Sequence, residues 1–194
     1  MKAFTSVTAG AAVLDRPDVD TDQIIPKQFL KRIERTGFGE FLFYDWMQQA
    51  DFPLLWPEYH GAPILAAGRN FGCGSSREHA AWALQDFGYR AIVAESFGDI
   101  FATNCSKNGL LTVVLEPDAV RELIDSAPAE ATIDLEAQAV TLPSGRVVPF
   151  DVDADVRERL LNGWDDISLT EQREGEIARY EADRERTGPD ALAI

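Results

Sequence analysis

The chemically richest stretch of the chain is GRNFGCGSSREHA, which spans residues 68–80. Ser75, Ser76 and Arg77 follow Gly74 directly, between a short apolar segment and a helical pattern. A glycine loop that leads from a strand into a helix presents free backbone N–H groups and the positive end of the helix dipole, which favours an anionic ligand. Arg77 can bind a carboxylate through two parallel hydrogen bonds. The stretch therefore predicts a site for a small anion.

This loop lacks the signatures of better-known glycine motifs. No Gly-Lys-Ser/Thr follows it, as a P-loop requires, and position 77, where a dinucleotide-binding fingerprint needs glycine, holds arginine. The G-x-S-x-G sequence of a nucleophile elbow is absent as well. The residues alone leave one alternative open, a turn in which Ser75 or Ser76 only caps the following helix.

The chain has few residues that could hold a metal. Its cysteines are Cys73 and Cys105, and its histidines are His60 and His79. Iron–sulfur clusters and structural zinc sites usually need four ligands, so we expect this chain to bind no metal or cofactor by itself. Two distant cysteines form no disulfide framework, which favours a reducing compartment.

The acidic segment Asp18–Asp22 resembles the start of a calcium loop. Gln23 stands where that loop needs glycine, and Phe29 stands where it needs glutamate. The segment is therefore expected to be an acidic turn that caps the element after it.

Length and charge restrict the classes of function. The chain has 194 residues and a net charge of -15, which fits one domain and argues against nucleic acid and anionic membrane surfaces as partners. No apolar run approaches the roughly 18 residues of a membrane span, and the N-terminus lacks the apolar region of a signal peptide. These features predict a cytoplasmic protein.

The centre of the chain alternates apolar runs with helical patterns. This order predicts right-handed crossovers and a parallel sheet with helices packed against it. The expected strands are Phe4–Leu14 (a strand or a hairpin), Pro63–Ala67, Ala91–Ala94 and Leu110–Leu115, and the expected helices are Ser76–Phe87 and Phe97–Lys107.

The C-terminal part changes character. A helix over Asp118–Ser126 is predicted to precede a small antiparallel hairpin region, because residues 132–150 alternate apolar and polar side chains around a Pro-Ser-Gly turn. A short helix is expected at Asp155–Leu161. Ser168 and Glu171 have capping-box spacing and predict a last helix that starts there. Residues from about 164 to 194 would then form a helical extension whose end frays.

Three motifs together resemble a known family. These are DTDQIIPKQFL at residues 20–30, RTGFG at 35–39 and NFGCGSSREHA at 70–80, with NGWDDISLT at 162–170 as a further match near the C-terminus. They resemble the small subunit of 3-isopropylmalate dehydratase, which is similar to the swivel domain of aconitase. The resemblance covers nearly the whole chain.

The resemblance implies a single α/β domain over residues 1–194, a swivelling β/β/α fold with a largely parallel central sheet, a small antiparallel hairpin region and C-terminal helices. It also implies a hydro-lyase of leucine biosynthesis that isomerises 2-isopropylmalate and 3-isopropylmalate by dehydration and rehydration. The partner would be a large subunit that carries a [4Fe–4S] cluster. Ser75 would be the catalytic base, Ser76 and Arg77 would contact a substrate carboxylate, and Lys31 and Arg32 would help to select the substrate side chain.

The chemistry of these residues agrees with the roles that the resemblance implies for them. Removal of a proton next to a carboxylate builds negative charge, which cationic and N–H donors stabilise. Two alternatives remain: a related enzyme that acts on homoaconitate or on citraconate and methylmalate, and a non-catalytic anion-binding assembly module that uses the same loop.

Overall fold

The computed structural model describes residues 1–31, 36–75 and 77–187. The chain divides into two compact units, Met1–Gly163 and a second unit that begins at Trp164. The first unit contains the sheet and the glycine loop, and the described part of the second, up to residue 187, contains two helices.

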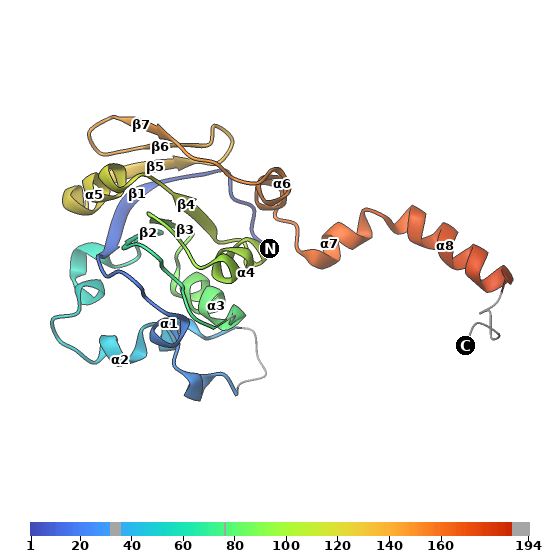
Figure 1. The fold of residues 1–194 in the computed structure, drawn as a ribbon, viewed down its shortest axis with the longest axis horizontal. Helices are drawn as coiled ribbons and strands as arrows, with labels where there is room; N and C mark the ends of the chain where they lie inside the picture. The colour runs from blue at the N-terminus through green and yellow to red at the C-terminus, as the bar shows by residue number, and fades with distance from the viewer. Residues whose placement is uncertain (32–35, 76, 188–194) are drawn as a thin grey trace. The chain divides into compact units, whose positions relative to one another are not determined.

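Seven strands of the described residues form one mixed sheet in the order β4-β3-β2-β1-β5-β6-β7 (Figure 1). Strands β1 to β4 run parallel, and β5 to β7 continue the sheet beyond β1 in antiparallel pairs. The predicted α/β fold, with a parallel central sheet and a small antiparallel region, is confirmed. The strands are β1 Ser6–Leu14, β2 Ile64–Ala67, β3 Ala91–Ala94, β4 Leu111–Val114, β5 Glu130–Asp134, β6 Ala139–Thr141 and β7 Val147–Pro149.

Strand β1 is uninterrupted, so the alternative of a hairpin at Phe4–Leu14 is wrong. Gly10 pairs with Glu130 of β5 and continues the strand. A side chain at Gly10 would collide with the backbone carbonyl of Pro128. The glycine therefore permits a close approach of two backbones and does not make a turn.

The predicted crossovers are present, since α3 connects β2 to β3 and α4 connects β3 to β4. Helices α3 and α4 end at Gly88 and Gly109, as the sequence predicts. Short 3-10 turns lie along the chain between β1 and β2. The helices of the first unit are α1 Thr21–Ile24, α2 Tyr44–Met47, α3 Glu78–Phe87, α4 Asp99–Asn108, α5 Pro117–Ser126 and α6 Ala154–Asn162, and the 3-10 turns are η1 Lys27–Phe29, η2 Gly39–Phe41, η3 Pro53–Leu55 and η4 Pro57–Tyr59.

The central strands face an apolar layer on each side. Leu65 and Ala67 of β2 belong to a buried cluster that includes residues of α3 and α4. Ile64 and Ala66, which alternate with them, belong to a second cluster that includes residues of α5. Because β2 and β3 are buried along their whole length, they are fixed from both faces, as parallel strands commonly are.

The carboxyl ends of β1 and β2 hold two loops together at one edge of this sheet. Leu14 and Ala67 are the last residues of the two strands and lie opposite each other. Beyond them, the N–H of Asp18 donates to the carbonyl of Arg69 at 2.9 Å. Loops at this edge are where open α/β sheets bind ligands.

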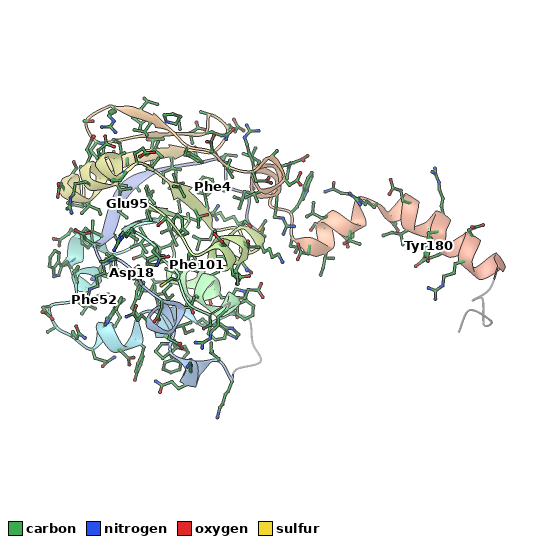
Figure 2. The ribbon with its side chains drawn as sticks, in the orientation of Figure 1. Phe4, Asp18, Phe52, Glu95, Phe101 and Tyr180 are labelled. Carbon is green, nitrogen blue, oxygen red and sulfur yellow. The ribbon has the colours of Figure 1, made fainter. Side chains whose placement is uncertain are left out.

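The second unit contains α7 Asp166–Glu171 and α8 Glu174–Thr187. The predicted capping box of Ser168 and Glu171 is wrong, because Asp165 is the N-cap of α7 and accepts a hydrogen bond from the N–H of Ser168 at 2.8 Å. Tyr180 projects from α8 with 68% of its surface exposed (Figure 2). No helix within residues 1–31, 36–75 and 77–187 is long and apolar enough to cross a membrane.

Replacement of Gly72 by alanine is expected to destabilise the first unit more than the same change at Gly61. Both glycines have a φ of +73°, so both changes impose the same left-handed strain, about 1–2 kcal/mol. A Cβ at Gly72 would also overlap the ring of Phe101, which is 2% exposed, whereas a Cβ at Gly61 meets no atom within 4 Å. The overlap should add about 1–3 kcal/mol. Urea denaturation of both variants measures the difference in their free energies of unfolding. Equal losses of this free energy in the two variants would contradict a rigid loop packed on Phe101.

Candidate active site

The glycine loop and the acidic segment are joined by backbone hydrogen bonds. The N–H of Gly72 donates to the carbonyl of Val19 at 2.7 Å, and the N–H of Thr21 donates to the carbonyl of Cys73 at 3.0 Å. Asp20 and Cys73 form an isolated parallel bridge. The two segments are more than 50 residues apart in the sequence, and the parallel pairing of β1 and β2 brings them together.

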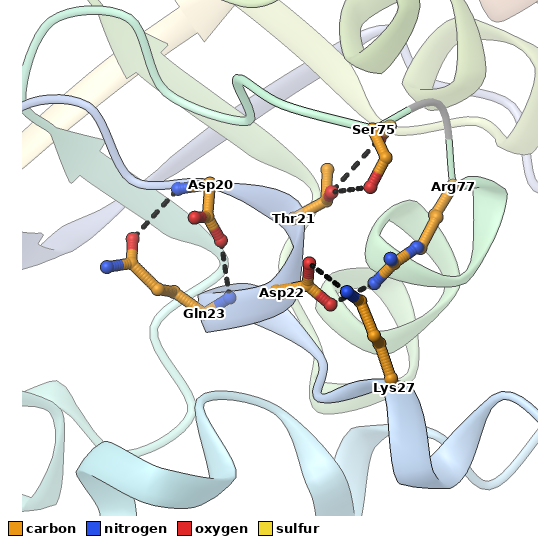
Figure 3. Close-up of polar contacts among 7 residues, drawn as sticks. All are labelled: Asp20, Thr21, Asp22, Gln23, Lys27, Ser75 and Arg77. Atoms are coloured by element: carbon orange, nitrogen blue, oxygen red, sulfur yellow. Dashed lines mark hydrogen bonds and ion pairs between the residues drawn. The ribbon is translucent and has the colours of Figure 1, made fainter.

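The acidic segment is a helix cap, as the sequence predicts. Asp20 is the N-cap of α1, and its side chain accepts a hydrogen bond from the N–H of Gln23 at 2.8 Å. The side chain of Gln23 accepts one in return from the N–H of Asp20 at 2.9 Å. This capping box fixes the start of α1 beside the glycine loop (Figure 3).

Ser75 lies directly against the first residue of α1. The hydroxyl of Thr21 donates to the backbone carbonyl of Ser75 at 3.0 Å, and its oxygen lies 3.4 Å from the Ser75 hydroxyl oxygen (Figure 3). Ser75 is exposed, whereas Thr21 is 1% exposed. The Ser75 hydroxyl can therefore meet a ligand from solvent while its backbone is held from behind.

Arg77 reaches the same segment through Asp22. Nη1 of Arg77 is bound to the Asp22 carboxylate, and Nζ of Lys27 lies 3.7 Å from the other oxygen of that carboxylate (Figure 3). The Arg77 side chain is only 17% exposed, whereas that of Lys27 is 73% exposed. The pair with Arg77 is thus the better shielded of the two, and it holds the guanidinium at Asp22, the residue after Thr21 in α1.

Ser75 does not cap α3. The N-cap of α3 is Arg77, and the Arg77 side chain makes no cap hydrogen bond. The N–H of Arg77 instead donates to the carbonyl of Ser75 at 2.9 Å, and α3 begins at Glu78, after the predicted start at Ser76. The interpretation of Ser75 as a mere helix cap is therefore wrong.

A hollow of about 180 Å³ opens next to Ser75. The first turn of α4, where Asp99 follows the N-cap Gly98, forms part of its lining. This contribution of α4 was not predicted from the sequence. The lining residues are Gly72, Gly74, Ser75, Gly98, Asp99, Ile100 and Phe101.

The remaining predicted substrate contacts are less defined. Lys31 directly follows Leu30, the C-cap of η1, and is exposed to solvent. Arg32 and Ser76 lie outside the described residues, so their predicted roles remain predictions. The structure thus ties Ser75 and Arg77 to neighbouring residues of α1 and leaves the other three residues as expectations.

Burial favours the uncharged thiol form of both cysteines. Burial, followed by the charges of Asp20 and Asp18, raises the pKa of the Cys73 thiol, which favours the uncharged form. Cys105 is completely buried, and its pKa is raised well above the ordinary value. No group of three or more His, Cys, Asp or Glu side chains among the described residues could hold a metal ion.

His79 is part of an aromatic cluster. Its ring centroid lies 4.6 Å from that of Trp82 and 5.2 Å from that of Phe38. Burial is the main cause that lowers the pKa of His79, which favours the neutral ring. His79 therefore stabilises the packing of α3, and its neutral imidazole adds no charge to the site.

The sheet and its glycine junction define an aconitase-type C-terminal domain, and the family model for the aconitase C-terminal domain matches residues 1–118. A second model, LeuD_N, matches residues 121–154. The chain is 55% identical to the 3-isopropylmalate dehydratase small subunit of Geobacillus kaustophilus, over 93% of this chain and 96% of that one. It is 51% identical to the small subunit of the same name from Rubrobacter xylanophilus, over 99% and 100% of the two chains. The chain belongs to the family of 3-isopropylmalate dehydratase small subunits, which confirms the resemblance found in the sequence motifs.

A solved structure supports the fold independently. The crystal structure of 3-isopropylmalate dehydratase from Methanocaldococcus jannaschii superposes with a TM-score of 0.70 at 24% identity, over 90% of this chain and 99% of that one. The identity is low enough that this likeness concerns the fold alone.

Proposed function

We propose that this chain is the small subunit of a heteromeric hydro-lyase that interconverts 2-isopropylmalate and 3-isopropylmalate in the leucine pathway, in the cytoplasm. Relatives that carry the small-subunit name match it over 93–99% of its length at 51–55% identity. The strongest structural support is that Ser75 contacts Thr21 and Arg77 binds Asp22, neighbouring residues of the same short helix, because a base and a carboxylate-binding cation must lie close together for this reaction.

Ser75 is the base in this proposal. An ordinary serine hydroxyl is a poor base at neutral pH, so its alkoxide must be stabilised by neighbouring donors. Helix α3 begins at Glu78, three residues beyond it, and the dipole of that helix favours negative charge at this end.

Arg77 is the carboxylate clamp. Asp22 binds Nη1 and thereby fixes the plane of the guanidinium, so that a substrate carboxylate would bind through the remaining guanidinium nitrogens. Ser76 would contact the same carboxylate, and Lys31 and Arg32 would help to select the substrate side chain.

The donor set of this chain does not fit a [4Fe–4S] cluster. Cys105 is fully buried and Cys73 lies in the glycine loop, and no third ligand joins either of them among the described residues. We therefore assign the cluster to the large subunit, and this chain's share of the chemistry is to hold the carboxylate and to accept the proton.

A comparison of substrates tests the proposal. The enzyme assembled with its large subunit is expected to show a kcat/KM for 2-isopropylmalate at least about 10-fold above the values for homoaconitate and citraconate, since a pocket that fits a branched alkyl group gains roughly this factor per methylene. An equal or higher kcat/KM for homoaconitate or citraconate would assign the chain to a related enzyme instead.

A further inference from the structure

Thr21 is a buried polar residue whose hydroxyl has no access to solvent. It is 1% exposed, and its hydroxyl oxygen lies between the two oxygens of one residue, 3.0 Å from the backbone carbonyl of Ser75 and 3.4 Å from the Ser75 hydroxyl. Its position is fixed by the hydrogen bond from its N–H to Cys73 and by the capping box at the start of α1. The side chain therefore offers its hydroxyl to Ser75 from a rigid support.

The protons of the two hydroxyl groups can be assigned from donor and acceptor chemistry. A backbone carbonyl only accepts, so the single hydroxyl proton of Thr21 points to the carbonyl of Ser75. Towards the Ser75 hydroxyl, the Thr21 oxygen then acts as an acceptor. The separation of 3.4 Å is long for a hydrogen bond between hydroxyl groups, so this second contact is weak in the resting state.

Ionisation of Ser75 reverses this arrangement. When Ser75 releases its proton to water, its alkoxide can no longer donate and becomes the strongest acceptor near Thr21. Rotation of the Thr21 hydroxyl about its C–O bond then moves the hydrogen bond from the Ser75 carbonyl to the alkoxide. Hydrogen bonds to an ionised oxygen are shorter and about twice as strong as neutral ones, so the contact should contract.

We propose that Thr21 is a positioning residue that acts through Ser75 by donating a hydrogen bond to its alkoxide and so lowering the pKa of the Ser75 hydroxyl. Thr21 keeps its own proton throughout, and the proton taken from the substrate carbon goes to the Ser75 oxygen, which regenerates the hydroxyl. This inference rests on the proposed role of Ser75 as the base and adds the group that makes it a competent one.

Two substitutions of Thr21 distinguish the loss of its hydrogen-bond donor from the loss of its side-chain packing. Thr21→Val keeps the branched shape and removes the hydroxyl, whereas Thr21→Ser keeps the hydroxyl and removes the methyl group. In the enzyme assembled with its large subunit, Thr21→Val is expected to lower kcat by roughly 100-fold, as loss of one preorganised donor does elsewhere. Thr21→Ser is expected to retain most of the native kcat.

The pH dependence of kcat/KM is the decisive readout, because it reports the ionisation of the free enzyme. Removal of a donor to the alkoxide disfavours the charged form and raises the pKa of Ser75. The acidic limb of the profile should therefore move to higher pH in Thr21→Val and return to its native position in Thr21→Ser. If the acidic limb of the kcat/KM profile keeps its native position in Thr21→Val, the inference is overturned. It is also overturned if Thr21→Val and Thr21→Ser lose the same factor in kcat and neither profile shifts.

Ser75→Ala, measured in the same assay, separates the two proposals. An inactive Ser75→Ala enzyme beside a Thr21→Val enzyme with a native profile would overturn the role of Thr21 alone. An active Ser75→Ala enzyme would overturn the base assignment and the role of Thr21 with it. Co-purification of each variant with the large subunit shows that the loss of rate is not a loss of assembly.

Discussion

The Ser75→Ala enzyme, assembled with its large subunit, is expected to lose roughly 100- to 10,000-fold in kcat, the usual contribution of a general base. The loss should be confined to catalysis. Ser75 is exposed, so the change leaves no internal cavity, and Thr21 is bound to the backbone carbonyl of Ser75, which alanine retains. Subunit assembly and the free energy of unfolding should therefore stay close to their native values.

Ser6→Ala is the matched control for this variant. Ser6 is also exposed, but it lies at the start of β1, opposite Asp134, at the other end of the strand from the loop that carries Thr21. Its replacement should leave kcat unchanged. A Ser75→Ala enzyme that turned over at nearly the native rate would show that another group takes the proton.

The isolated chain is expected to have no isomerase activity, which is the second large effect. The described residues place Ser75 and Arg77, the proposed base and carboxylate clamp, at the edge of the sheet, but they assemble no group of three or more His, Cys, Asp or Glu side chains that could hold a metal ion. Loss of a hydroxyl group from the substrate needs a Lewis acid on its oxygen, which we assign to the cluster of the large subunit. The large subunit alone should be equally inactive, because it would lack Ser75 and Arg77.

The parts of this site that depend on local pattern could be predicted from the sequence. Ser75 and Arg77 stand in a short run whose glycines and flanking elements mark a strand, a tight loop and a helix. The alternation of strands and helices likewise predicts the parallel sheet, because crossover connections are nearly always right-handed. Asp20 as a helix cap follows from its position before a polar turn.

The parts that depend on pairing between distant segments could not be predicted. Thr21 and Asp22 become site residues only because β1 and β2 are neighbours, which brings them to Ser75 and Arg77 across 54 and 55 positions of sequence. No periodicity within residues 15–25 indicates this contact. The first turn of α4 joins the hollow for the same reason.

The predicted helix start at Ser168 was wrong because two residues near it are both suitable N-caps. Asp165 and Ser168 are both good N-cap residues, and the spacing of Ser168 and Glu171 favoured the second. In the structure the carboxylate of Asp165 accepts hydrogen bonds from both the N–H and the hydroxyl of Ser168, each at 2.8 Å. Ser168 therefore lies inside α7 and starts no helix of its own.

The initial rate of 2-isopropylmalate isomerisation, measured for this chain, for its large subunit and for their mixture, tests the central claim most directly. This chain is proposed to supply half of an active site, so the rate should be at background for each subunit alone and appear only in the mixture. It should stay at background when the Ser75→Ala chain replaces the native one. Full turnover by this chain alone, or by the large subunit alone, would contradict the account.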